Sequence, residues 1–287
     1  MPDLLVDVDG TRLDVRVAGA GAPAVVCMSA LGGAHDYWRD VARMLSEETT
    51  VVTYARPGLG DSDRLPAAET ALPRDGGWLA AQLRSLLRRA GIVAPYVLTS
   101  GSIGGFIIDQ FAARWPDEVA GLVLNDPTGP RPFVGLADPD RPYATNDGDL
   151  ADADEGGVTF SGDLLRTFLS VPAPANRDGR YVVLSSAVGR WLRSEPADWH
   201  RPLTLAEVDA QWVEMQVEWT RRLSALHVVA DTAGHHIYRD APALTAFVVR
   251  EVVDAARRRR PVRIDRDALA AVAGHLAGPD PGRRRTS

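Results

Sequence analysis

Short apolar segments alternate with amphipathic ones along most of this chain of 287 residues, and this alternation is the feature that most constrains its fold. Residues 24–28, 51–54, 96–99 and 121–124 are brief uncharged runs, typical of strands that are covered on both faces of a parallel sheet. Segments of helical period lie between them, as in strand-helix-strand units with right-handed crossovers. We therefore expect an α/β protein with a doubly wound, mostly parallel sheet of about eight strands and helices on both faces.

The alternation stops after residue 126 and resumes at residue 181. The segment between these points is rich in proline, glycine and acidic residues, which favours a small lid inserted into the core. The expected divisions are a core of residues 1–126 and 181–260, a lid of residues 127–180 and a C-terminal tail of residues 261–287.

The other expected elements follow from the same patterns. Two alternating strands at the start are joined by Asp9-Gly10, a strong signal for a two-residue hairpin. Further strands are expected at residues 181–184 and 226–230, and helices at residues 36–45, 77–90, 103–114, 205–223 and 242–258.

Composition excludes several classes of chemistry. All 32 basic residues are arginine, so no lysine is available to clamp a nucleotide phosphate or to form a Schiff base. A net charge of −6 argues against general binding of nucleic acid. The single cysteine, Cys27, cannot form an internal disulfide, which suits a reducing compartment.

Two features of the sequence bear on where the protein is expected to be located. The N-terminus has no pattern of a signal peptide, so a cytoplasmic location is expected. The longest uncharged run, residues 90–108, contains a proline and four glycines, so it does not suit a membrane span and no membrane partner is expected. The sequence indicates no oligomeric state.

The same uncharged run has the pattern of a strand, a sharp turn and a helix, with Ser102 at the turn. Ser100 and Gly104, two positions away on either side, are small enough for the backbone to close around a strained serine. Such a turn presents the hydroxyl as a nucleophile and aims the N-terminus of the next helix at the site, where free N–H groups can stabilise an oxyanion. The bare motif also fits a tightly packed structural turn.

Four further segments have distinctive patterns: SALGGAHDYW at 29–38, YARPGLGDSD at 54–63, GLVLNDP at 121–127 and AGHHIYRDAP at 233–242. With these segments in this order around the turn at Ser102, residues 24–251 resemble the α/β-hydrolase superfamily. Two departures are Ser29-Ala30, where the family usually has His-Gly, and Ser100-Gly101, where it usually has Gly and a larger residue.

The resemblance implies a role for each residue of the site. Ser102 is the expected nucleophile and His235 the expected general base, with His236 as a competing candidate. The backbone N–H groups of Ile103 and Leu31 are the expected oxyanion donors.

The acid of the triad is less well defined by the sequence. Family members most often place it just after the strand expected at residues 181–184, where this chain has no carboxylate within ten residues. Some members place it one strand earlier, which is the position of Asp126. The alternatives are Asp198 or Glu195, or no acid at all, and Asp126 could also be only a turn residue before a proline.

The expected function is a serine hydrolase that cleaves an ester, thioester or lactone through an acyl-enzyme. Its partner is a small-molecule acyl substrate, and no cofactor or metal ion is expected. Two alternatives remain, a non-hydrolytic acyltransferase, cyclase or lyase with the same triad and an inactive binding member. The residues expected to line the acyl pocket are Phe133, Tyr143, Phe160, Leu164 and Phe168.

Overall fold

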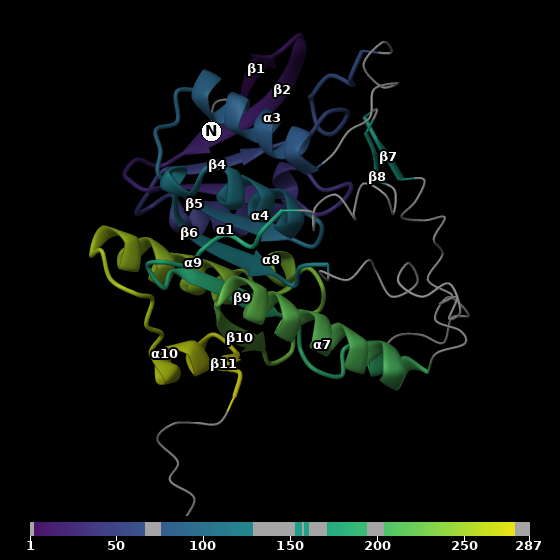
Figure 1. Ribbon diagram of the computed structural model, residues 1–287, viewed down its shortest axis with the longest axis vertical. Helices are drawn as coiled ribbons and strands as arrows, with labels where there is room; N and C mark the ends of the chain where they lie inside the picture. Colours follow the sequence, from purple (N-terminus) through teal and green to yellow (C-terminus); the bar gives the residue numbers. More distant parts are fainter. Residues whose placement is uncertain are drawn as a thin grey trace, which may run out of the picture.

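A computed structural model describes residues 3–66, 76–128, 153–156, 158–160, 171–193 and 204–278 of the chain. Its main feature is a nine-stranded sheet in the order β1-β2-β4-β3-β5-β6-β9-β10-β11 (Figure 1). The strands are β1 (Asp3–Val8), β2 (Thr11–Ala18), β3 (Ala24–Met28), β4 (Val51–Tyr54), β5 (Tyr96–Gly101), β6 (Val119–Asn125), β9 (Tyr181–Ser185), β10 (Leu226–Ala230) and β11 (Gly274–Leu276). A separate two-stranded sheet pairs β7 (Ala153–Glu155) with β8 (Val158–Phe160).

Helices cover both faces of the large sheet (Figure 1). One apolar core lies under α3, α4 and α7, and the other lies under α1, α8, α9 and α10. The helices are α1 (Arg39–Leu45), α3 (Gly76–Arg89), α4 (Gly104–Arg114), α7 (Leu205–Leu223), α8 (Ile237–Asp240), α9 (Pro242–Arg257) and α10 (Arg266–Ala271), with 3-10 turns η1 (His35–Trp38), η2 (Pro116–Glu118) and η3 (Trp191–Arg193). No helix in these described parts of the chain combines the length and apolarity needed to cross a membrane.

The central strands alternate their side chains between the two cores. In β3, Val26 packs into the core under α4, whereas Val25 and Cys27 pack into the core under α9. The strands β4, β3, β5, β6, β9 and β10 run parallel, and β1, β2 and β11 pair antiparallel with their neighbours. The expected doubly wound, mostly parallel α/β sheet is confirmed.

The first hairpin forms where the sequence predicts it. Asp9 and Gly10 both have positive φ, at 53° and 88°, as the tight turn of a twisted hairpin requires. Val8 pairs with Thr11 on either side of the turn.

The C-terminal end of the sheet differs from expectation. β11 lies inside the segment expected to be a tail after residue 260, yet it pairs antiparallel with β10 and brings the sheet to nine strands rather than about eight. It is three residues long and only Gly274 is buried, so it has no alternating pattern for the sequence to show.

α7 begins where the sequence encodes a capping box. The hydroxyl of Thr204 accepts a hydrogen bond from the Glu207 N–H, and the Glu207 carboxylate accepts one from the Thr204 N–H. This arrangement satisfies two N–H groups that a helix start leaves unpaired. The helix then presents Asp209 and Trp212, which are both buried, toward the loop after β9.

A buried ion pair joins α4 to α7. The Arg222 guanidinium donates to both oxygens of Asp109, at 3.3 and 2.8 Å, and the Asp109 side chain is fully buried. Burial raises the pKa of Asp109 and the arginine opposes that rise, so the carboxylate depends on its partner.

Replacing that arginine is expected to destabilise the fold. Arg222→Met should lower the free energy of unfolding by about 3–5 kcal/mol, because it leaves a buried carboxylate without a counter-ion. Chemical denaturation measures this loss. The double variant Asp109→Leu/Arg222→Met should recover most of it, since an apolar pair costs no desolvation of charge. A loss of under about 1 kcal/mol in Arg222→Met would mean that the pair behaves as an exposed one.

Candidate active site

Ser102 lies in the sharp turn between β5 and α4. Its φ of +52° is in the left-handed region, which a residue with a Cβ rarely adopts. The turn closes because its neighbours are glycines. A Cβ on Gly101 would lie 2.2 Å from Cε1 of Tyr238, and one on Gly104 would lie 2.7 Å from Cγ of Met28. The structure therefore has the strained strand-to-helix turn that the sequence motif predicts.

Residues at the end of β6 and just after it hold the backbone and the side chain of Ser102. Its N–H donates to the carbonyl of Asn125 at 3.2 Å, and its Oγ lies 3.0 Å from the Oγ1 of Thr128, which is itself buried. Thr128 is fixed in turn, because the indole of Trp219 donates to its carbonyl at 2.7 Å. Within the described parts of the chain no hydrogen bond joins Ser102 to His235, so the hydroxyl pairs with Thr128 in this structure.

Asp126 immediately follows β6, on the same edge of the sheet as Ser102. Its Oδ2 lies 2.8 Å from Nδ1 of His235, and its side chain is fully buried. Its Oδ1 accepts from the Ser186 N–H at 2.8 Å, and the Trp212 indole donates to Oδ1 and Oδ2 at 3.0 and 3.1 Å. Four contacts from three other segments thus fix this carboxylate against the imidazole.

The surroundings of Asp126 keep it ionised. Burial raises its pKa, but the hydrogen bond and charge of His235, the charge of Arg190 and the Ser186 N–H lower it by more, so the pKa lies below its ordinary value. Because the folded-state pKa is lowered, the carboxylate contributes stability above its ordinary pKa, and that contribution is lost as the pH falls through the lowered value.

His236, the competing base candidate, has a different environment. Its Nδ1 lies 3.0 Å from the hydroxyl of Tyr238, and its ring packs edge-on against Tyr37. Burial lowers the pKa of His236 to about 4, with the charges of His235 and Arg239 acting in the same direction. His236 is therefore neutral at pH 7 and contacts a phenol, whereas His235 contacts the carboxylate.

The two histidines are expected to respond differently to the same substitution. His235→Gln should lower turnover by about 10⁶, the scale seen when a triad base is lost. His236→Gln should retain most of the activity, because His236 makes no contact with Asp126. Steady-state kinetics on an activated ester compares the two variants. Inactivation by His236→Gln alone would reverse the assignment.

The two expected oxyanion donors come from different elements. Ile103 is buried at the N-terminal end of α4, with a helical φ of −58°. Leu31 lies in the loop after β3, partly buried against the core that contains Ile103. The buried guanidinium of Arg56 holds this loop, donating to the carbonyls of Ser29 and Ala30 at 2.7 and 2.6 Å.

Comparisons with known proteins agree with this architecture. The family model described as "alpha/beta hydrolase fold" matches residues 23–158, which include the turn at Ser102 and Asp126. The chain has the α/β-hydrolase fold. An esterase from Thermogutta terrifontis, solved with malate bound, superposes with a TM-score of 0.60 at 17% identity, over 89% of this chain and 99% of that one.

Curated relatives match only part of the chain. "Putative carbamate hydrolase RutD" of Escherichia coli is 33% identical over 104 residues, which are 36% of this chain and 37% of the relative. "Uncharacterized protein YqjL" of Bacillus subtilis is 28% identical over 109 residues, which are 38% of this chain and 41% of the relative. The matched segments thus span about two fifths of the length of these two relatives.

Several expected site residues lie outside the described part of the chain. They are Phe133, Tyr143, Leu164 and Phe168, the side chain of Phe160, and the alternative acids Glu195 and Asp198. The lining of the acyl pocket therefore stays a sequence prediction.

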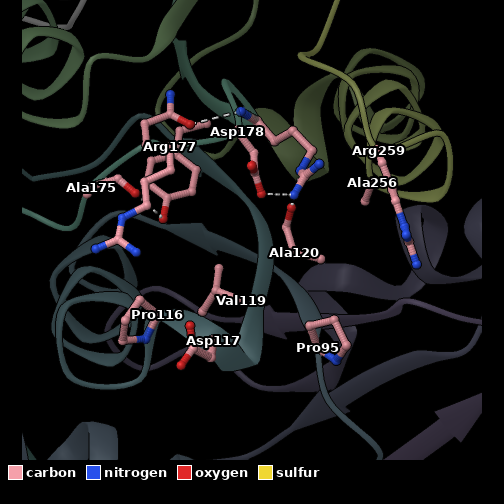
Figure 2. A pocket seen from close by; sticks show the side chains of 13 residues that line it. Pro95, Pro116, Asp117, Val119, Ala120, Ala175, Arg177, Asp178, Ala256 and Arg259 are labelled. Carbon is pink, nitrogen blue, oxygen red and sulfur yellow. Dashed lines mark hydrogen bonds and ion pairs between the residues drawn. The ribbon is translucent and has the colours of Figure 1, made fainter.

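A cavity of about 550 Å³ is lined by residues at the amino-terminal ends of the central strands (Figure 2). Its lining includes Val119 at the start of β6 and Tyr181 at the start of β9, with Pro95 just before β5. Ser102 and Asp126 follow the carboxyl ends of β5 and β6, so the length of the strands separates the cavity from them. The cavity is therefore not part of the Ser102 site.

Sequence reasoning missed the groups that hold the site together. Thr128 contacts Ser102 from 26 residues away, and Trp212 and Arg190 contact Asp126 from other segments of the chain. The sequence shows Arg56 only as part of a loop motif. The one local signal for its role is that its charge lies within a buried run, two residues after the end of β4.

Proposed function

We propose that this α/β-hydrolase is a serine hydrolase that cleaves a small-molecule ester, thioester or lactone through an acyl-enzyme. The observation that carries the proposal is the buried Asp126 carboxylate 2.8 Å from Nδ1 of His235, at the sheet edge where strained Ser102 lies. A carboxylate on Nδ1 fixes the tautomer in which Nε2 is free to accept a proton. The fold family and the relatives named as hydrolases support the same class.

The proposed reaction begins when the Ser102 hydroxyl turns from Thr128 to Nε2 of His235. Oγ attacks the carbonyl carbon while its proton passes to Nε2, and the N–H groups of Ile103 and Leu31 receive the oxyanion. The tetrahedral intermediate collapses, and the leaving alcohol or thiol takes the proton from the imidazolium. Water then repeats the sequence on the acyl-enzyme, releasing the acid and restoring Ser102.

Asp126 stays ionised throughout and stabilises the imidazolium without taking its proton. Four hydrogen-bond contacts hold its oxygens in place before the substrate arrives, so little reorganisation is needed during attack.

A fluorophosphonate probe tests the proposal, because only an activated serine is phosphonylated quickly. We expect one adduct per chain, mapped to Ser102 by peptide mass spectrometry. A panel of activated esters, thioesters, lactones and carbamates then defines the carbonyl class, carbamates being included because of the name of the Escherichia coli relative.

The outcomes separate the alternatives. Labelling of Ser102 with acyl transfer to an added alcohol, but no free acid, would favour an acyltransferase. The absence of any adduct would contradict an activated nucleophile and leave a binding protein. An adduct on Ser100 would contradict the assignment of the turn.

A further inference from the structure

The loop after β9 brings a cation to the carboxylate of Asp126. Residues 186–193, in this loop, carry no acid. Instead, a terminal guanidinium nitrogen of Arg190 lies 3.5 Å from Oδ2 of Asp126, and 13% of the arginine side chain is exposed. The same oxygen contacts Nδ1 of His235 at 2.8 Å. One carboxylate oxygen therefore faces a guanidinium and an imidazole.

The surroundings of Arg190 hold its side chain in this position. The Asp209 carboxylate on α7 accepts from the N–H groups of Gly189 and Trp191, at 2.9 and 3.3 Å, so it fixes the backbone on both sides of the arginine. The guanidinium carbon lies 4.0 Å from the ring centroid of Trp191 and 4.5 Å from that of Trp212. These rings leave the guanidinium little room to move away from Asp126.

The role of Arg190 is electrostatic, because its buried nitrogens are not used for hydrogen bonds. Nε and one terminal nitrogen are buried and have no hydrogen-bond partner within the described ranges. Desolvation of such a group is costly, and the nearby charges of Asp126 and Asp209 offset part of the cost. An apolar side chain would fill the space between the two tryptophans without that cost.

We propose that Arg190 is a positioning residue that limits how strongly Asp126 favours the protonated form of His235. The inference rests on the proposed function, in which neutral His235 accepts the proton of Ser102. The carboxylate attracts an imidazolium, whereas the guanidinium on the same carboxylate oxygen repels it. The two charges therefore act in opposite directions on the protonated ring.

The charged groups around Asp126, Arg190 and the two histidines come from several segments of the chain. Asp126 follows β6, Arg190 follows β9, and Asp209 belongs to α7. His236, Arg239 and Asp240 lie in the segment of His235 itself. Of the two arginines among these groups, Arg190 is the one in contact with Asp126. Its removal should therefore change the electrostatic interaction between Asp126 and His235 most.

The test compares Arg190→Met with Arg190→Lys. Methionine keeps an apolar stem between the two rings and removes the charge, whereas lysine keeps the charge. The acid limb of the pH profile of kcat/KM should move up by about one pH unit in Arg190→Met and stay near the wild-type position in Arg190→Lys. If Arg190→Met does not fold, Arg190→Gln supplies the neutral variant.

If Arg190 only stabilises the fold, the two variants should give a different result. Both variants would then lower the melting temperature and turnover without moving the acid limb, and this outcome overturns the proposal. NMR titration of the His235 ring in the folded protein gives a readout that does not need activity. If wild-type protein neither labels nor turns over, the proposed function fails, while the ring titration of wild type and Arg190→Met still tests Arg190.

Discussion

Ser102→Ala is expected to lower the turnover of any ester that the wild-type protein cleaves by about 10⁶. The substitution removes the attacking oxygen and leaves the carboxylate-imidazole pair intact. It should not unfold the protein, because the hydroxyl makes one side-chain hydrogen bond, to Thr128, and alanine fits the same space. The measurements are kcat on an activated ester and the melting temperature of the purified variant.

Ser100→Ala is the matched control for this prediction. Ser100 lies near the end of β5, two residues before Ser102, and is fully buried. Within the described part of the chain its hydroxyl has no hydrogen-bond partner. Its removal should therefore leave turnover near the wild-type value and cost little stability. An inactive Ser100→Ala beside an active Ser102→Ala would show that the wrong serine was assigned as nucleophile.

Much of the fold can be predicted from the sequence because its elements carry local signals. β3 and α7 begin and end at the expected residues, since one is a continuous apolar run and the other starts at a capping box. β11 could not be predicted, because a three-residue edge strand owes its pairing to the neighbouring β10 and not to its own pattern.

The residues of the site also differ in whether a local sequence signal reveals them. The turn at Ser102 is a local motif, so the sequence shows it directly. The partner of His235 depends on which strand ends lie together, and the sequence left several carboxylates open. β6 and β9 are neighbours in the sheet, so a residue after either strand could reach the imidazole. The Trp212 indole that fixes Asp126 comes from a residue 86 positions away, and no spacing rule connects the two.

Asp126→Asn is expected to lower turnover by about 10⁴, because it reverses the hydrogen bond to His235. In the wild-type protein Oδ1 faces two N–H donors, from Ser186 and Trp212. The single amide oxygen of asparagine should take that position, which puts its NH₂ group against Nδ1 of His235. Nδ1 must then accept a hydrogen bond instead of donating one, so Nε2 carries the ring hydrogen and can no longer take the proton of Ser102.

A role for Asp126 limited to the turn predicts a different pattern, with about 1 kcal/mol of stability lost and activity nearly retained. Kinetics and denaturation of Asp126→Asn therefore distinguish the two roles. Asp198→Asn is the companion variant, because Asp198 is an alternative acid after β9. An active Asp126→Asn beside an inactive Asp198→Asn would place the acid after the later strand. If Asp126 is the acid, Asp198→Asn should keep the wild-type turnover. The tautomer of His235 is then fixed by Oδ2 of Asp126, which lies 2.8 Å from Nδ1.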